Sequence, residues 1–292
     1  MTNVGWRKFG EYSGCKIDGV AAVPKPTTML HMERAYYLTA MIEAPTYGAV
    51  QSYDGAAMSG GPLHNIAVYP KGMTQGSVFQ LLRAIEVGAP RSDALHQLWS
   101  MYTQLDWVVT QDGLLRSTKT GQPVDGTLIR DTFTPIAGKV PQTGPQWDAA
   151  SRWAVAHHNV FADPLTYAAQ KDFAIGWLLS SQRALESTFY QGADPKQIDV
   201  GAKGLSMQED LAMAVYHCYS VNGPAPARDD LIAALKVSHR GYPFANALIQ
   251  QLSATAFGNW ENRYTRTRNA AMNSGLWPKE LFAGAGALFP AK

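Results

Sequence analysis

The chain has 292 residues, of which 46% are hydrophobic and 16% charged, so it can bury a sizeable core and does not have the composition of an intrinsically disordered protein. Its net charge of +2 excludes a strongly basic nucleic-acid-binding protein. Its two cysteines argue against a fold held together by several disulfide bonds, and it has no run near the ~18 apolar residues that a membrane helix needs.

The first third of the chain is predicted to begin irregularly and then to alternate helices with a hairpin. Residues 1–26 are rich in glycine and proline and are predicted to form an irregular lead-in. Apolar residues at helical spacing predict a helix over 28–43. Residues 46–68, rich in glycine and tyrosine, are predicted to form a hairpin or loop, followed by helices over 77–87 and 92–108.

The rest of the chain is predicted to be a set of helices preceded by a small β insertion. Residues 109–146 contain turn dipeptides and prolines, which predict a short hairpin and an extended connector. Further helices are predicted over 146–158, 164–190, 206–220, 227–238, 241–257 and 259–274. We therefore expect a mainly α (α+β) fold, with one domain over 27–292 that carries the insertion at about 109–146.

Glu43 is the first candidate for chemistry, because it ends the helix predicted over 28–43. Its neighbours Ile42 and Ala44 are apolar, and the helix before it is apolar on one face. Apolar surroundings raise the pKa of a carboxylic acid, so we expect Glu43 to be protonated near neutral pH. Such an acid can donate a proton to the oxygen of a glycosidic bond. A solvated glutamate at a helix end is the alternative interpretation.

Asp54 is the second candidate, within the hairpin predicted over 46–68. A carboxylate facing Glu43 would activate water or stabilise the positive charge of a glycosidase transition state. The alternative is an aspartate that only forms a turn, because Asp54 is followed by Gly55.

Five polar and aromatic side chains of the same segment are candidates for substrate binding. They offer hydrogen-bonding groups and a face on which a sugar ring can stack. These residues are Tyr47, Tyr53, Ser59, His64 and Asn65. For His64, a structural histidine is the alternative.

This part of the chain resembles the lysozyme-like superfamily, which includes goose-type lysozymes, lytic transglycosylases and chitosanases. Those families place an acid at the end of a helix, as Glu43 is placed, and follow it with a β-hairpin, as at 48–66. The stretch Tyr216–Pro224 is similar to the Tyr-Asn-x-Gly-Pro element that lines the sugar cleft of lytic transglycosylases, although two residues separate Tyr219 from Asn222. The resemblance adds Tyr219 and Asn222 to the substrate-binding candidates. A helix that simply ends at Gly-Pro is the alternative.

The resemblance implies a glycosidase that cleaves the glycan strands of bacterial peptidoglycan. It is either a muramidase in which Asp54 assists Glu43 or a lytic transglycosylase in which the acid acts alone. A chitosanase-like glycosidase is one alternative, and a non-catalytic virion structural or interaction protein on a lysozyme-like scaffold is another.

No metal or other cofactor is expected, because the chain lacks HExxH and Cys-x-x-Cys motifs and the adjacent His157 and His158 point apart on a helix. The expected partner is the polysaccharide, without nucleic acid or stable membrane insertion. No apolar signal-peptide segment follows Met1, so we expect synthesis in the cytoplasm and delivery to the cell wall by bacteriophage lysis or within a virion.

Overall fold

A computed structural model describes most of the chain, and within it the chain divides into two compact units. Unit 1 comprises Met1–Ala22 and Ala44–Phe173, and unit 2 comprises Val23–Glu43 and Ala174–Lys292. The described residues are 4–9, 12–52, 56–134, 143–180, 183–201, 204–221, 224–254, 263–284 and 286–291.

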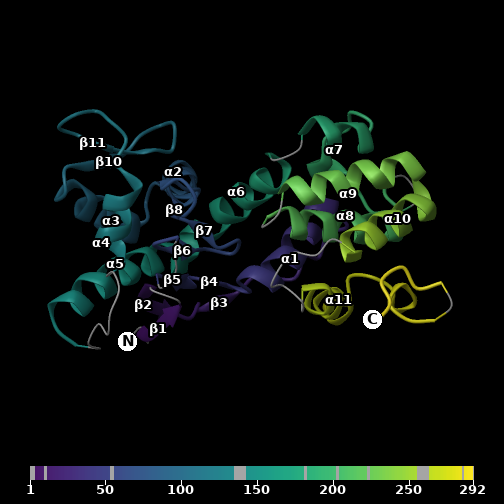
Figure 1. Ribbon diagram of the computed structural model, residues 1–292, viewed down its shortest axis with the longest axis horizontal. Helices are drawn as coiled ribbons and strands as arrows, with labels where there is room; N and C mark the ends of the chain where they lie inside the picture. Colours follow the sequence, from purple (N-terminus) through teal and green to yellow (C-terminus); the bar gives the residue numbers. More distant parts are fainter. Residues whose placement is uncertain are drawn as a thin grey trace. The chain divides into compact units, whose positions relative to one another are not determined.

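Unit 1 is built around a five-stranded antiparallel sheet with the strand order β1-β2-β5-β6-β7 (Figure 1). Its strands are β1 (Val4–Phe9), β2 (Tyr12–Ile17), β5 (Val50–Gln51), β6 (Ser59–Gly60) and β7 (Asn65–Ile66). Three two-stranded sheets pair β3 (Ala21–Ala22) with β4 (Thr46–Tyr47), β8 (Val68–Tyr69) with β9 (Thr74–Gln75), and β10 (Trp107–Val109) with β11 (Leu115–Ser117).

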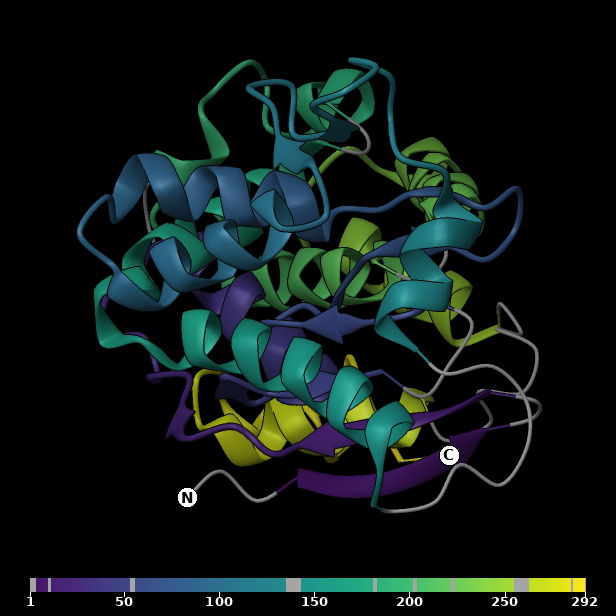
Figure 2. The same cartoon turned by 90° about the vertical axis from the view of Figure 1, so that its left-hand side faces the viewer.

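The helices of unit 1 pack around this sheet and around an aromatic core. They are α2 (Val78–Gly88), α3 (Asp93–Thr103), α4 (Gly126–Phe133) and α5 (Pro145–Ala162), with a short 3₁₀ helix η1 (Pro164–Thr166). The long helix α5 lies against β2, β5 and β6 (Figure 2). It approaches β6 closely because residue 60 is a glycine: a Cβ atom there would lie 2.4 Å from the Phe161 ring.

The core between α3, α4 and α5 contains a buried Tyr–His pair. The Tyr102 hydroxyl lies 2.8 Å from Nε2 of His157, and Nδ1 of His157 lies 2.8 Å from the Trp153 carbonyl oxygen. Both ring nitrogens therefore have partners inside the core. Burial lowers the pKa of His157 to about 4.

Unit 2 is a helical bundle in which α8 is the central helix. Its helices are α1 (His31–Glu43), α7 (Arg183–Phe189), α8 (Met207–Ser220), α9 (Pro224–Val237), α10 (Gly241–Ala254) and α11 (Arg263–Ser274), with the 3₁₀ helices η2 (Pro195–Gln197) and η3 (Lys279–Leu281). Helix α8 packs against α1, α9 and α10 (Figure 1), and every residue from Glu209 to Ser220 is buried. Helix α6 (Tyr167–Ser180) runs from unit 1 into unit 2.

The start of α8 is fixed by a capping box. Ser206 accepts a hydrogen bond from the backbone N–H of Glu209, whose carboxylate accepts one from the backbone N–H of Ser206. Arg240 pairs with the same carboxylate, and the backbone N–H of Gly241 donates to it at 2.8 Å. Glu209 therefore ties the first turn of α8 to the start of α10.

The predicted fold class is confirmed, because the described chain is mostly helical with short strands. Three segments differ from the sequence-based expectation. Residues 1–26, expected to be irregular, contain β1, β2 and β3. The insertion 109–146 contains the extra helix α4. The helix expected over 164–190 begins as the 3₁₀ helix η1 and is followed by α6 and α7, with residues 181–182 outside the described residues. In β1 and β2, pairing over six residues outweighs the glycines that suggested irregular structure.

The single domain expected over 27–292 is instead two compact units. The chain crosses between the units three times: at Ala22–Val23, directly after Glu43, and at Phe173–Ala174 inside α6. The first crossing is followed by Pro24 and Pro26 and the second by Pro45, whereas the third lies within a helix, so composition gives no sign of that last boundary. No helix among the described residues is long and apolar enough to cross a membrane.

Candidate functional site

A pocket of about 450 Å³ lies in unit 2 beside α7 and η2. This volume is within the range of small-molecule sites. Its lining contains apolar and polar residues. The apolar ones are Leu179, Ala193 and Pro195, and the polar ones are Glu186, Ser187, Asp194 and Lys196. Two carboxyl groups and an ammonium group thus meet at a single concave surface.

The two carboxyl groups differ in their surroundings. Glu186 is only 1% exposed although it lines the pocket, whereas Asp194 is exposed and accepts a hydrogen bond from the backbone N–H of Lys196 at 3.1 Å. Removal from water costs the charged form of a carboxyl group far more than its neutral form. A buried acid and a solvated carboxylate beside the same pocket are suited to opposite roles in acid–base chemistry.

Three other titratable side chains surround Glu186 behind the pocket wall. Its Oε1 lies 3.8 Å from Nδ1 of the buried His217. Burial raises the pKa values of Tyr190 and Tyr216, and the neighbouring Glu186 carboxyl group raises them further. Burial also lowers the pKa of His217 to about 3, so this imidazole is neutral over the physiological range.

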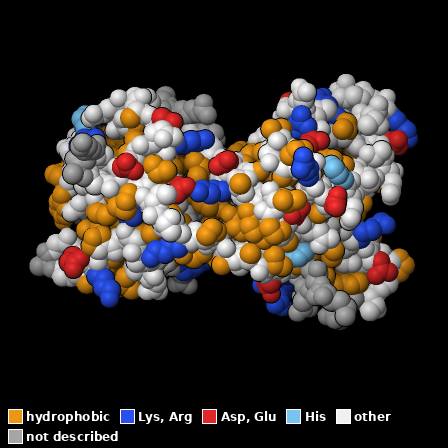
Figure 3. Space-filling model, turned by 180° about the vertical axis from the view of Figure 1, so that it is seen from behind, with side chains coloured by type: hydrophobic (Ala, Val, Ile, Leu, Met, Phe, Trp, Pro, Cys, Tyr) orange, Lys and Arg blue, Asp and Glu red, His pale blue; other side chains and the backbone are white. Residues whose placement is uncertain are grey.

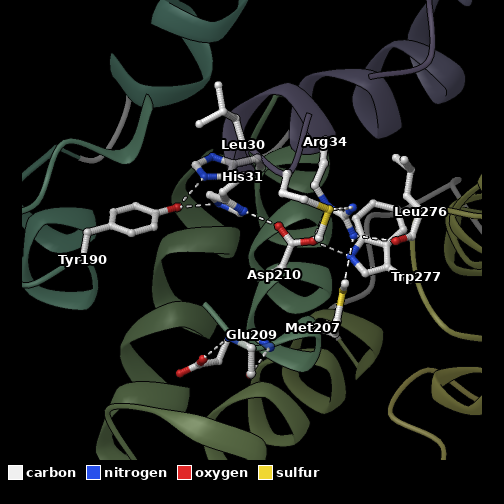
Figure 4. A network of polar contacts seen from close by, with 12 residues as sticks. Leu30, His31, Arg34, Tyr190, Met207, Glu209, Asp210, Leu276 and Trp277 are labelled. Atoms are coloured by element: carbon white, nitrogen blue, oxygen red, sulfur yellow. Dashed lines mark hydrogen bonds and ion pairs between the residues drawn. The ribbon is translucent and has the colours of Figure 1, made fainter. Parts of the chain in front are cut away.

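A buried chain of hydrogen bonds continues from His217 into the centre of unit 2. The Tyr190 hydroxyl lies 3.1 Å from Nε2 of His217 and 2.9 Å from Nε2 of His31. Nδ1 of His31 lies 2.6 Å from Oδ1 of Asp210. Figure 4 shows Tyr190, His31 and Asp210 pointing toward one another from the segment after α7, from α1 and from α8.

Asp210 closes this chain with a buried ion pair. Arg34 Nε donates to its Oδ2 at 2.8 Å and Trp277 Nε1 donates to the same oxygen at 2.6 Å (Figure 4). Arg34 also donates to the carbonyl oxygen of Leu276 at 2.6 Å. The negative charge of Asp210 is therefore compensated by Arg34 and by three hydrogen bonds inside unit 2.

Glu43 lies at the end of α1, as the sequence predicts, but it lies in an internal ion pair. Its Oε1 accepts a hydrogen bond from Arg263 on α11 at 2.9 Å, and the two side chains are 9% and 2% exposed. The same guanidinium donates to the Cys218 carbonyl oxygen and lies 5.3 Å from the Tyr219 ring. This environment is charged and does not match the apolar one expected for a proton donor.

The candidate binding residues near the hairpin belong to unit 1, whereas Glu43 belongs to unit 2. Tyr47, Ser59 and Asn65 are buried, and the Tyr47 ring stacks on Tyr167 with centroids 3.9 Å apart. His64 is partly exposed, and burial lowers its pKa to about 4.

Three of the predicted site residues, Tyr53, Asp54 and Asn222, lie outside the described residues. Tyr219 is buried at 2% exposure beside Arg263. The pair His157–His158 makes separate contacts, since His158 Nδ1 lies 2.6 Å from the Gly48 carbonyl oxygen. Among the residues that the structure describes, no three His, Cys, Asp or Glu side chains form a group that could hold a metal ion.

The residues that line the pocket were missed by the analysis of the sequence, although a signal for Glu186 exists. Glu186 is the fourth of the seven residues of α7, and the left-handed residues Gln191 and Gly192 and then Pro195 follow it. An acid near a helix end, followed by glycine and proline, is the pattern that singled out Glu43. The prediction of a single helix over 164–190 leaves no helix end near Glu186, so the pattern is not recognised there.

Comparisons of the chain with protein-family models, with curated proteins and with solved structures find no match. The site is therefore argued from its own chemistry.

Proposed function

We propose that this chain is an enzyme that cleaves glycosidic bonds in the glycan strands of bacterial peptidoglycan, and that Glu186 rather than Glu43 is the proton donor. The observation that carries the proposal is that Glu186, a residue only 1% exposed, is among those that line a pocket of about 450 Å³. Burial favours the neutral acid, and as proton donor Glu186 would have to turn its carboxyl group from the pocket wall toward a substrate oxygen.

Asp194 supports the same proposal as the second carboxylate of the pocket. A solvated carboxylate stays charged and can activate water or stabilise an oxocarbenium-like transition state. If Asp194 takes no part, Glu186 acts alone and a hydroxyl group of the substrate closes an anhydro ring. The substrate class comes from the sequence resemblance, and so does delivery of the protein to the cell wall by a bacteriophage.

Glu43 has a structural role in this proposal. Its carboxyl group accepts a hydrogen bond from the Arg263 guanidinium and is thus occupied by an internal ion pair. Arg263 remains cationic, since its pKa is raised by the neighbouring Cys218 and Glu43 against the effect of burial. The pair links the end of α1 to the start of α11.

Two matched variants decide between the acids. Glu186→Gln is expected to lower the rate at which purified cell walls lose turbidity by about 10²- to 10⁴-fold, the contribution of a positioned general acid. Glu43→Gln, assayed at a temperature at which it is folded, is expected to retain that rate within a few-fold. Retained lysis by Glu186→Gln would contradict the assignment.

Mass spectrometry of the products completes this test. Reducing muramic acid ends indicate hydrolysis, and anhydro ends indicate transglycosylation. Release of reducing ends from chitosan but not from peptidoglycan would favour a chitosanase-like enzyme. An absence of products from both polymers would favour a non-catalytic interaction protein.

A further inference from the structure

The buried polar chain of unit 2 connects the proposed acid to a second proton-binding group. It runs from Glu186 through His217 and Tyr190 to His31, and each of these four side chains is at most 3% exposed. A fully buried chain of titratable groups is costly unless every member is hydrogen-bonded. We infer that His31, Tyr190 and His217 form a proton relay that ends at Glu186, so that Glu186 and His31 share one proton.

The far end of the relay is fixed by Asp210. Its carboxylate only accepts hydrogen bonds, so Nδ1 of His31 carries a proton in either state of the relay. Nε2 of His31 is then the atom that can gain or lose a proton, and it faces the Tyr190 hydroxyl at 2.9 Å.

With the shared proton on His31, every donor points toward Glu186. Nε2–H of His31 donates to Tyr190, the Tyr190 hydroxyl donates to Nε2 of His217, and Nδ1–H of His217 faces Glu186. Glu186 is a carboxylate in this state.

One proton shift at each contact converts this state into the other. The His31 proton passes to the Tyr190 oxygen, the Tyr190 proton to Nε2 of His217, and the His217 Nδ1 proton to Oε1 of Glu186. Tyr190 and His217 end with as many protons as they began with, His31 becomes neutral, and Glu186 becomes the protonated acid. His217 Nδ1 and Glu186 Oε1 are 3.8 Å apart and not hydrogen-bonded, and the backbone of Leu178 also lies beside the His217 ring, so the last step requires the Glu186 side chain to rotate into hydrogen-bond distance of Nδ1.

The charges of the cluster favour such an exchange. Asp210 and Arg34 neutralise each other. Glu186 and His31 are either both neutral or oppositely charged, so the cluster has zero net charge in both states. The other titratable or charged groups around it are Tyr216 on α8 and Arg228 on α9, and Asp194 and Lys196 at the pocket.

Tyr190 is a positioning residue of the relay. The relay itself does not depend on the proposed function; only its effect on catalysis does. With substrate covering the site, the relay brings the shared proton from His31 to Glu186 without needing water there. Once Glu186 has donated that proton, both groups lack it until water supplies another. Tyr190→Phe removes the hydroxyl that joins the two histidines and keeps the ring, which packs 5.0 Å from Phe189.

The test follows the carboxyl carbon of Glu186 and the ring of His31 by NMR during a pH titration, with the Glu186 signal assigned from Glu186→Gln. In the wild-type chain both signals are expected to change with the same midpoints, because the two groups share a proton. In Tyr190→Phe they are expected to titrate separately. His31→Gln, which cannot hold the shared proton, must leave Glu186 titrating as an isolated group.

The matched control is Tyr102→Phe, which removes the same type of buried Tyr–His hydrogen bond from unit 1. It is expected to leave the coupled titration unchanged. Separate midpoints in the wild-type chain, or coincident midpoints in Tyr190→Phe, would overturn the relay.

Cell-wall cleavage provides the second readout. Tyr190→Phe is expected to lower kcat by about tenfold or more, part of what a positioned acid supplies, and to shift the pH profile while leaving KM unchanged. If the wild-type chain shows the coupled titration but Glu186→Gln still lyses cell walls, the relay is supported and the proposed function is refuted. An unchanged pH profile in Tyr190→Phe would refute the relay's role in catalysis.

Discussion

At the scale of single residues, the partner Arg263 changes the role that Glu43 can have. Their side chains are 9% and 2% exposed and 2.9 Å apart. We expect Glu43→Gln to lower the free energy of unfolding by about 3 kcal/mol, because Arg263 is left as a buried charge without its carboxylate. Urea unfolding measures this loss.

The double variant Glu43→Gln with Arg263→Met is the control for that measurement. It removes both charges, so it is expected to recover part of the lost stability. A single variant as stable as the wild-type chain would show that the ion pair contributes nothing.

The candidate site could be predicted from the sequence only as a local pattern. The acid at the end of a helix is present at Glu43 as expected, but its partner Arg263 is 220 residues away and no local pattern indicates the pairing. Glu186 has the same local pattern and lines a pocket instead. Burial and long-range partners distinguish the two acids, and both depend on tertiary structure.

At the scale of elements, the contact between α5 and the sheet depends on Gly60. A Cβ atom there would lie 2.4 Å from Cε2 of Phe161, which belongs to a rigid ring and cannot move aside alone. We expect Gly60→Ala to lower the free energy of unfolding by about 1–3 kcal/mol, the usual cost of overpacking. Chemical denaturation checks the value.

Gly176 in α6 is the matched control. A Cβ atom there meets nothing within 4 Å, so Gly176→Ala is expected to raise stability by up to about 1 kcal/mol through helix propensity. Equal effects of the two substitutions would contradict the packing argument.

The helices were the most predictable elements, because their apolar spacing and their ends are local. The helix predicted over 28–43 corresponds to α1, and the one over 206–220 corresponds to α8 with its Ser206 cap. Strands β1 and β2 were missed because their stability comes from pairing with each other and with β5, which a local reading of glycines cannot show.

At the scale of the whole molecule, each unit contains its own buried core and its own buried histidine. Figure 3 shows charges of both signs mixed over one face of the molecule, consistent with the net charge of +2. The two cysteines are also divided between the units, and both are buried and free: Cys15 in unit 1 and Cys218 in unit 2.

Two of the buried histidines, one in each unit, predict how stability depends on pH. Burial lowers the pKa of His157 in unit 1 from 6.5 to about 4, and that of His217 in unit 2 to about 3. Between pH 6.5 and these values the unfolded chain binds protons that the folded chain does not. Stability is therefore unaffected by these groups above pH 6.5 and falls as the pH drops toward 4.

We expect each of these histidines to lower the free energy of unfolding by on the order of 3 kcal/mol at the low-pH end of that window. Urea unfolding at pH 7 and at pH 5, followed by Trp fluorescence, measures the loss. His157→Gln removes one of the histidines with a lowered pKa and is expected to reduce the slope of stability against pH by up to one proton, whatever it does to stability at pH 7. A wild-type free energy of unfolding that is constant from pH 7 to pH 5, or a slope that His157→Gln leaves unchanged, would show that the unit 1 histidine is not held neutral by its core.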